Sequence, residues 1–128
     1  MRTIILKTSP KKPDAKKIRM AATIIRRGGI VAFPTETVYG VGANALDEKA
    51  VRKIFRAKGR PFDDPLIVHI SAEWQLGGLV KKVSALAKSL MKEFWPGPLT
   101  LVLKNQGKCL PLSLAACTLL PYGCLKIR

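Results

Sequence analysis

The stretch from Pro34 to Ile70 constrains the fold most, because it has the length and the order of a single βαβ unit. A hydrophobic strand ends at Pro34, and a polar loop that contains glycines follows it. A basic helix is predicted from about Glu48 to Ala57, and a buried strand is predicted at Leu66–Ile70. Alternating strands and helices are typical of α/β proteins, so we expect the α/β class with a largely buried sheet.

The same alternation continues on both sides of this unit. We expect further strands at Thr3–Lys7, Ile30–Phe33 and Leu99–Leu103, and further helices at Ala15–Arg27 and Val83–Phe94. Asp14 and Asp47 precede two helices as N-caps, and Gly28 with Gly29 ends the first of them. In the last strand, Thr100 is expected to face opposite to its neighbours, because side chains alternate along a strand.

Each predicted helix carries apolar residues at helical spacing. The expected buried stripes are Ile18, Ala21, Ala22 and Ile25 in the first helix, Ala50, Val51, Ile54 and Phe55 in the second, and Leu86, Leu90 and Phe94 in the third. With 128 residues, of which 48% are hydrophobic, the chain has the size and composition of one globular domain.

The charge is strongly positive. Twenty-three Lys and Arg residues against eight Asp and Glu residues give a net charge of +15. Residues 1–27 are the most biased part, because Asp14 is their only acid. Such a surface attracts polyanions such as nucleic acid, nucleotides or anionic lipid, although a solvated basic shell without a partner has the same composition.

The three cysteines all lie near the end of the chain, at Cys109, Cys117 and Cys124, and their spacing fits no zinc motif. An odd number of cysteines and no secretory signal favour a reducing, cytoplasmic setting. Residues 109–125 carry no charge but contain two prolines. They are too short for a membrane span, which needs roughly 20 apolar residues, so we expect no membrane partner.

Polar residues gather where the strand before Pro34 ends. Thr35 and Thr37 have hydroxyl groups that can bind a small zwitterion or a phosphate, or can cap the loop. Tyr39 can stack on a ring or pack against the protein. Gly40 and Gly42 fit a loose dinucleotide-binding pattern, but six residues, Pro34 to Tyr39, separate the strand end from Gly40, whereas the true motif begins at the turn.

Lys58 and Arg60 lie just beyond the second predicted helix, on either side of Gly59. A point charge beside a planar, forked cation suits phosphate oxygens. Cations at a helix C-terminus also stabilise the helix dipole alone. His69, the only histidine, stands between Val68 and Ile70 and should point away from the face that they share; it is either a ligand-binding or a structural residue.

Four segments in register resemble the YrdC-like family of threonylcarbamoyl-AMP synthases. They read FPTETVYGVGANALD, AKGRP, DDPLIVHI and WPGPLTLVL, and the resemblance covers roughly residues 18–104. It implies a twisted mixed sheet flanked by helices. It also implies a nucleotidyltransferase that converts L-threonine, bicarbonate and ATP, with Mg²⁺, to threonylcarbamoyl-AMP and pyrophosphate for the threonylcarbamoyladenosine modification of tRNA.

The resemblance also implies roles for individual residues. Thr37 and His69 match the family's L-threonine contacts, and Lys58, Arg60 and Asp64 match its nucleotide contacts, with Lys58 and Arg60 as the catalytic cations. Thr35 and Tyr39 are further candidates for lining the pocket. Family members are also described as binding double-stranded RNA through a basic concave face, so RNA or tRNA is an expected partner.

The chain departs from the family pattern in three places. Asp64 stands where an Asn is usual, and a carboxylate near triphosphate needs a metal between them. A Thr-Val-Ala-Val-Arg strand and a Ser-x-Asn motif, both of which contribute to the site, are absent. We therefore expect residues 1–108 to form a partial, truncated domain with impaired activity, and residues 109–128 to be an atypical apolar tail.

Our hypothesis for this tail is that one base was lost or gained near Lys108, so that residues from about 109 onward are read in a shifted frame. With suitable codons, residues 118–128 read from the third base of the Thr118 codon give Thr-Val-Ala-Val-Arg-Met-Pro-Glu-Asn-Pro, which contains the missing strand. Two other interpretations remain open from the residues. The chain is a non-catalytic module that binds RNA or the ribosome, or it is an inert fragment.

Overall fold

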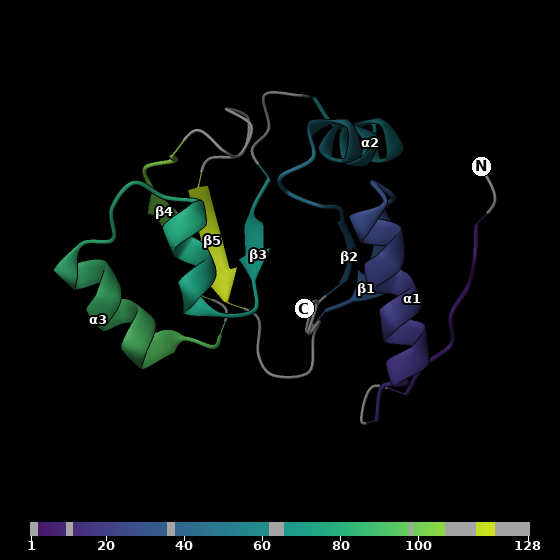
Figure 1. Cartoon of the computed structure of the whole chain (residues 1–128), viewed down its shortest axis with the longest axis horizontal. Coiled ribbons are helices and arrows are strands. Elements are labelled where there is room, and N and C mark those ends of the chain that lie inside the picture. The colour runs from purple at the N-terminus through teal and green to yellow at the C-terminus, as the bar shows by residue number, and fades with distance from the viewer. Residues whose placement is uncertain are drawn as a thin grey trace.

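The computed structural model describes residues 3–9, 12–35, 38–61, 66–97 and 99–106 together with the backbone of 115–119. Figure 1 shows one group of elements formed by α1, β1, β2 and α2, and a second formed by β3, α3, β4 and β5. The elements are α1 (Ala15–Arg26), β1 (Val31–Pro34), β2 (Tyr39–Gly42), α2 (Glu48–Lys58), β3 (Val68–Ile70), the 3-10 helix η1 (Glu73–Gly78), α3 (Ala85–Phe94), β4 (Leu101–Leu103) and β5 (Ala115–Leu119). The predicted α/β class is confirmed.

The described strands form two sheets. β1 and β2 make an antiparallel hairpin. In the second sheet the order is β3-β5-β4, and β5 runs parallel to β3 and antiparallel to β4, which makes the sheet mixed as expected. β5 belongs to the tail, where no strand was predicted. Its place between two strands follows from backbone pairing, which does not depend on a periodic side-chain pattern.

The loop predicted after Pro34 is in part a strand. β2 begins at Tyr39, and its Gly40 lies opposite Phe33 of β1. A Cβ atom at Gly42 would lie 2.9 Å from Phe33 Cε1, and one at Gly40 would lie 3.3 Å from Phe33 Cε2. The two glycines therefore make room for the aromatic ring of the neighbouring strand, which gives their spacing a structural cause unrelated to dinucleotide binding.

Both predicted N-caps are confirmed. Asp14 Oδ1 accepts a hydrogen bond from the backbone N–H of Lys16 at 2.8 Å, and Asp47 Oδ1 accepts one from Ala50 at 3.2 Å. These bonds satisfy amide groups that have no partner within the first turn of a helix. Gly28, with a φ of 76°, follows the end of α1 as predicted.

The apolar stripes of α1 and α2 lie on the buried faces of these helices. Ala21, Ala22 and Ile25 are buried in α1, while Ile18 is half-buried. The whole predicted stripe of α2 is buried, and Phe55 is only 1% exposed. Lys53 Nζ also donates a hydrogen bond of 2.6 Å to the carbonyl of Gly28, so α2 is tied to the end of α1.

A second core lies under the mixed sheet. It consists of Val68, Ile70, Leu76, Leu79, Val80, Met91 and Trp95. The predicted stripe of α3 is wrong at two of its three residues: Leu86 is 71% and Phe94 53% exposed, and only Leu90 is half-buried, whereas Ala87 and Met91 are buried. The apolar residues of α3 occupy two adjoining rows of the helix, and packing against Leu76 and Trp95 decides which row points inward.

Two strand predictions need correction. Thr3–Lys7 is not a strand, because no described strand lies beside it, and Ile4 and Ile5 are 58% and 82% exposed. A strand without a partner leaves its backbone groups to water. The strand expected to be buried at Ile30–Phe33 is found as β1, but its residues alternate between half-buried and exposed. Among the described helices, none has the length and apolar character needed to cross a membrane.

Candidate functional site

The turn after α2 holds the two predicted phosphate-binding cations. Lys58 is the exposed last residue of the helix, and Gly59 follows with a left-handed φ of 59°. The backbone N–H of Arg60 donates a hydrogen bond of 3.0 Å to the carbonyl of Phe55, a residue of α2 that is only 1% exposed. The backbone on which both cations stand is therefore anchored to the core.

The predicted pocket residues Thr35 and Tyr39 lie at the end of the β1–β2 hairpin. Thr35 Oγ1 donates a hydrogen bond of 2.5 Å to the carbonyl of Val38 and accepts one of 3.2 Å from the N–H of Val38. The loop-capping interpretation thus holds for this hydroxyl group. Tyr39 is 75% exposed, so its ring does not pack into the core and presents its surface to solvent.

His69 lies in the middle of β3, between the buried residues Val68 and Ile70. It is exposed on the opposite face of the strand, as the alternation predicted. Its backbone is in register with Thr118 of β5. Thr37 and Asp64 lie outside the described residues. Their joint arrangement with Lys58, Arg60 and His69 stays a prediction.

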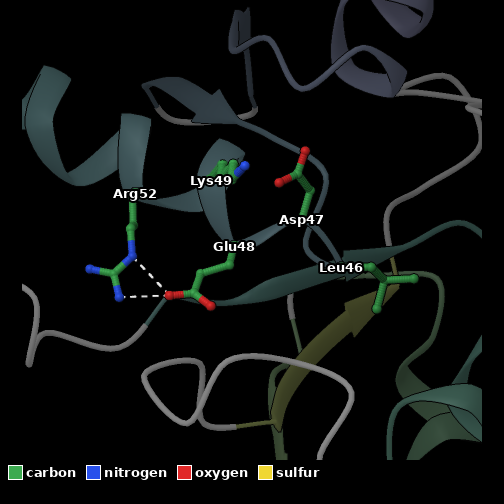
Figure 2. A pocket seen from close by; sticks show the side chains of 5 residues that line it. All are labelled: Leu46, Asp47, Glu48, Lys49 and Arg52. Carbon is green, nitrogen blue, oxygen red and sulfur yellow. Dashed lines mark hydrogen bonds and ion pairs between the residues drawn. The ribbon is translucent and has the colours of Figure 1, made fainter.

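One surface hollow, of about 560 Å³, lies at the beginning of α2. Figure 2 shows its lining residues Leu46, Asp47, Glu48, Lys49 and Arg52, with Glu48 and Arg52 turned toward each other. Arg52 Nε and Nη2 donate to the same Glu48 carboxylate oxygen at 2.9 and 2.6 Å, and Asp47 caps the helix. Asp47, Glu48 and Arg52 therefore stabilise the first turns of α2.

A second hollow, of about 630 Å³, lies between η1 and α3. Buried apolar residues, among them Leu76, Met91 and Trp95, line it together with the charged or exposed Glu73, Trp74, Lys88 and Lys92. No motif in the sequence predicts this hollow, although Lys88 and Lys92 are spaced by one helical turn. Neither hollow is lined by Lys58, Arg60 or His69.

In the described part of the chain, no group of three His, Cys, Asp or Glu side chains is placed to hold a metal ion. Lys58 and Arg60 thus flank the turn at Gly59, His69 is exposed on β3, and Tyr39 is exposed on the β1–β2 hairpin. Such groups bind anions and flat rings.

The chain is similar in sequence to known threonylcarbamoyl-AMP synthases. A threonylcarbamoyl-AMP synthase of Pyrococcus abyssi (strain GE5 / Orsay) is 66% identical over 87 residues, which are 68% of this chain and 26% of that protein. A threonylcarbamoyl-AMP synthase of Bacillus subtilis (strain 168) is 58% identical over 87 residues, or 68% of this chain and 25% of that protein. The chain therefore spans about a quarter of the length of these two relatives.

The fold has a counterpart among solved structures as well. The crystal structure of P. abyssi Sua5 complexed with L-threonine matches with a TM-score of 0.80 and 51% sequence identity, over 84% of this chain and 33% of that one. The sequence profile Sua5_yciO_yrdC, described as "Telomere recombination", matches residues 23–118. Because this match includes most of the chain, the protein belongs to the Sua5/YciO/YrdC family.

Proposed function

We propose that this chain carries the nucleotide-binding and threonine-binding part of an L-threonylcarbamoyladenylate synthase. Two relatives bear the name threonylcarbamoyl-AMP synthase, and a solved relative holds L-threonine. The overall reaction takes L-threonine, bicarbonate and ATP to threonylcarbamoyl-AMP, pyrophosphate and water, and the product serves the modification of tRNA.

The reaction proceeds in two steps. The amine of threonine first forms a bond to the carbon of bicarbonate, and loss of water leaves a carbamate. A carbamate oxygen then attacks the α-phosphorus of ATP, the bond from this phosphorus to the bridging oxygen breaks, and pyrophosphate leaves with the electron pair. Magnesium enters as part of the MgATP substrate. Negative charge is spread over the phosphate oxygens in the transition state, where positioned cations have their largest effect.

Lys58 and Arg60 are the residues that we assign to this phosphate charge. Thr37 and His69 are assigned to L-threonine, Asp64 to the nucleotide through its magnesium, and Thr35 and Tyr39 to the pocket wall. One observation supports the proposal most: the backbone that carries Lys58 and Arg60 forms an anchored turn, with Gly59 in a left-handed conformation and a backbone hydrogen bond from Arg60 to Phe55. This turn lies inside the segment that the family profile matches.

We further propose that residues 1–108 form the family domain and that residues 109–128 are translated from a shifted frame. The shift explains the missing Thr-Val-Ala-Val-Arg strand, and it implies that this chain has little or no synthase activity. Sequencing the coding DNA on both strands tests the shift directly. A confirmed frame, with no family-like sequence in the alternative frames, contradicts it.

The basic surface supports double-stranded RNA or tRNA as a partner. Exposed cations line the segment around α1, and they include Lys12, Lys16, Arg19, Arg26 and Arg27. They attract phosphate groups without reading a base sequence. A non-catalytic RNA-binding module would use the same surface, so the assay must separate the two functions.

Pyrophosphate release separates them. We would measure it for this chain and for a frame-restored version, with ATP, L-threonine and bicarbonate each omitted in turn. The synthase proposal expects release from the restored version that needs all three substrates and falls about a hundredfold or more in its Arg60→Ala variant, since a lost transition-state contact of this kind costs that much. Release without threonine, or an unaffected Arg60→Ala variant, contradicts the proposal.

A further inference from the structure

We propose that the hollow between η1 and α3 is a docking groove for an acidic peptide segment of another protein, anchored by one apolar side chain. The groove is separate from the candidate site. Its floor residues Leu76, Met91 and Trp95 belong to the core on the Val68 and Ile70 side of the mixed sheet. His69 points to the other side of β3. Peptide binding in the groove therefore uses none of the residues assigned to the synthase reaction and can be tested independently of it.

The floor of the groove fits an apolar anchor. Leu76, Met91 and Trp95 are 3%, 4% and 8% exposed. The indole N–H of Trp95 already donates a hydrogen bond of 2.9 Å to the carbonyl of Leu99, so this ring offers the groove only its apolar surface. Met91 is flexible and polarizable, and methionine adapts to ligands of different shape. A hollow of about 630 Å³ is within the range of small-ligand sites and accommodates a large side chain.

The rim supplies an aromatic contact and positive charge. Trp74 is 80% exposed, and exposed tryptophans are the residues that most often dominate the binding energy of interfaces. Lys88 and Lys92 are exposed and stand one turn apart on α3. Among the described residues no carboxylate forms an ion pair with either lysine. Glu73 is the one acid among the residues that line the groove.

This charge pattern selects the occupant. Two lysines against one glutamate favour a partner segment with negative charge. A second copy of this chain is a poor occupant, because its eight acids occur at most in pairs, at Asp47-Glu48 and Asp63-Asp64. A nucleobase is also a poor fit, because its polar edges would lose their hydrogen bonds to water above an apolar floor. An acidic peptide with one Phe or Leu satisfies both the rim and the floor.

Fluorescence anisotropy on the full chain tests the groove with defined probes. The first probe is a labelled 12-residue peptide of alternating Asp and Glu with a central Phe. The second carries Ser in place of the Phe, and the third carries Asn and Gln in place of the acids. We expect the first probe to bind about tenfold more tightly than either control, the difference that one well-buried anchor produces.

Protein variants locate the binding. Trp74→Ala, and Lys88→Glu combined with Lys92→Glu, should each weaken binding of the first probe about tenfold. The matched control is Lys16→Glu with Arg19→Glu on α1, which changes the net charge equally and should alter the Kd less than twofold. All of these residues are exposed, so the thermal unfolding temperature measured by circular dichroism should be the same in every variant.

Several outcomes overturn the proposal. If the Phe and Ser peptides bind equally, or if the α1 control variant loses as much affinity as the groove variants, the binding is due to the net charge of the protein and not to the groove. Absence of saturable binding up to millimolar peptide excludes the groove as a docking site. If a labelled U12 oligonucleotide binds more tightly than the peptide, and Trp74→Ala weakens this binding, the groove is a site for single-stranded RNA. If the chain self-associates and Trp74→Ala abolishes the self-association, the occupant is a second copy of the chain.

Discussion

Gly59 is the residue on which the candidate phosphate-binding turn depends. Its φ of 59° is a conformation that side chains with a Cβ atom rarely adopt, although no atom lies within 4 Å of a Cβ added there. The requirement is therefore one of backbone conformation and not of space. We expect Gly59→Ala to lower the free energy of unfolding by about 1–2 kcal/mol.

Gly77→Ala is the matched control for this prediction. Gly77 also has open space around it, but its φ is not positive. A Cβ atom there restricts the unfolded chain and is expected to be neutral or to stabilise slightly. Urea unfolding followed by circular dichroism measures both variants. Equal losses of stability would show that the left-handed conformation of Gly59 is not the cause.

Gly42 is constrained by space instead. A Cβ atom would lie 2.9 Å from the ring of Phe33, so Gly42→Ala forces the ring to move. We expect a loss of stability of about 1 kcal/mol, at the low end for overpacking because Phe33 is only half-buried. In a Phe33→Ala background the same change should cost almost nothing. A double-mutant cycle from urea unfolding checks this coupling, and additive effects would contradict it.

At the scale of elements, the helices differ in how well the sequence defined their buried faces. In α2 all four predicted stripe residues are buried, because charged residues occupy the remaining faces and leave one choice. In α3 apolar residues occur on two adjoining rows, so periodicity alone did not identify the row that packs against the core. The prediction chose the wrong row, and Leu86 and Phe94, which it expected to be buried, are exposed.

Two phenylalanine variants test this contrast. Phe55 in α2 is 1% exposed, and Phe94 in α3 is 53% exposed. We expect Phe55→Ala to lower the free energy of unfolding by about 3–5 kcal/mol, through lost burial and the cavity that remains. Phe94→Ala should cost less than about 1 kcal/mol, as for other exposed sites. Chemical denaturation measures the free energy of unfolding of both variants. A larger loss of stability for Phe94→Ala than for Phe55→Ala would contradict the packing of α3.

At the scale of the whole molecule, the net charge of +15 should govern any binding of RNA. Affinity for a double-stranded RNA should fall linearly with the logarithm of the salt concentration, because bound cations displace counterions. Lys16→Glu with Arg19→Glu on α1 should reduce this salt slope by about two, one for each lost phosphate contact. The control is Lys88→Glu with Lys92→Glu at the proposed peptide groove, which changes the net charge by the same amount. A larger effect of the control would place the RNA on the α3 side.

The sequence by itself determined the features that depend on local chemistry. These features are the caps at Asp14 and Asp47, the outward direction of His69 and the family motifs, and they all follow from residues close together in the chain. Tertiary structure alone decided which strands pair, which row of α3 is buried and that Phe33 lies against Gly40 and Gly42. It also decided that a groove lies beside Trp74. These features arise from contacts between segments distant in sequence, where several pairings satisfy the same local pattern and only the packed whole selects one.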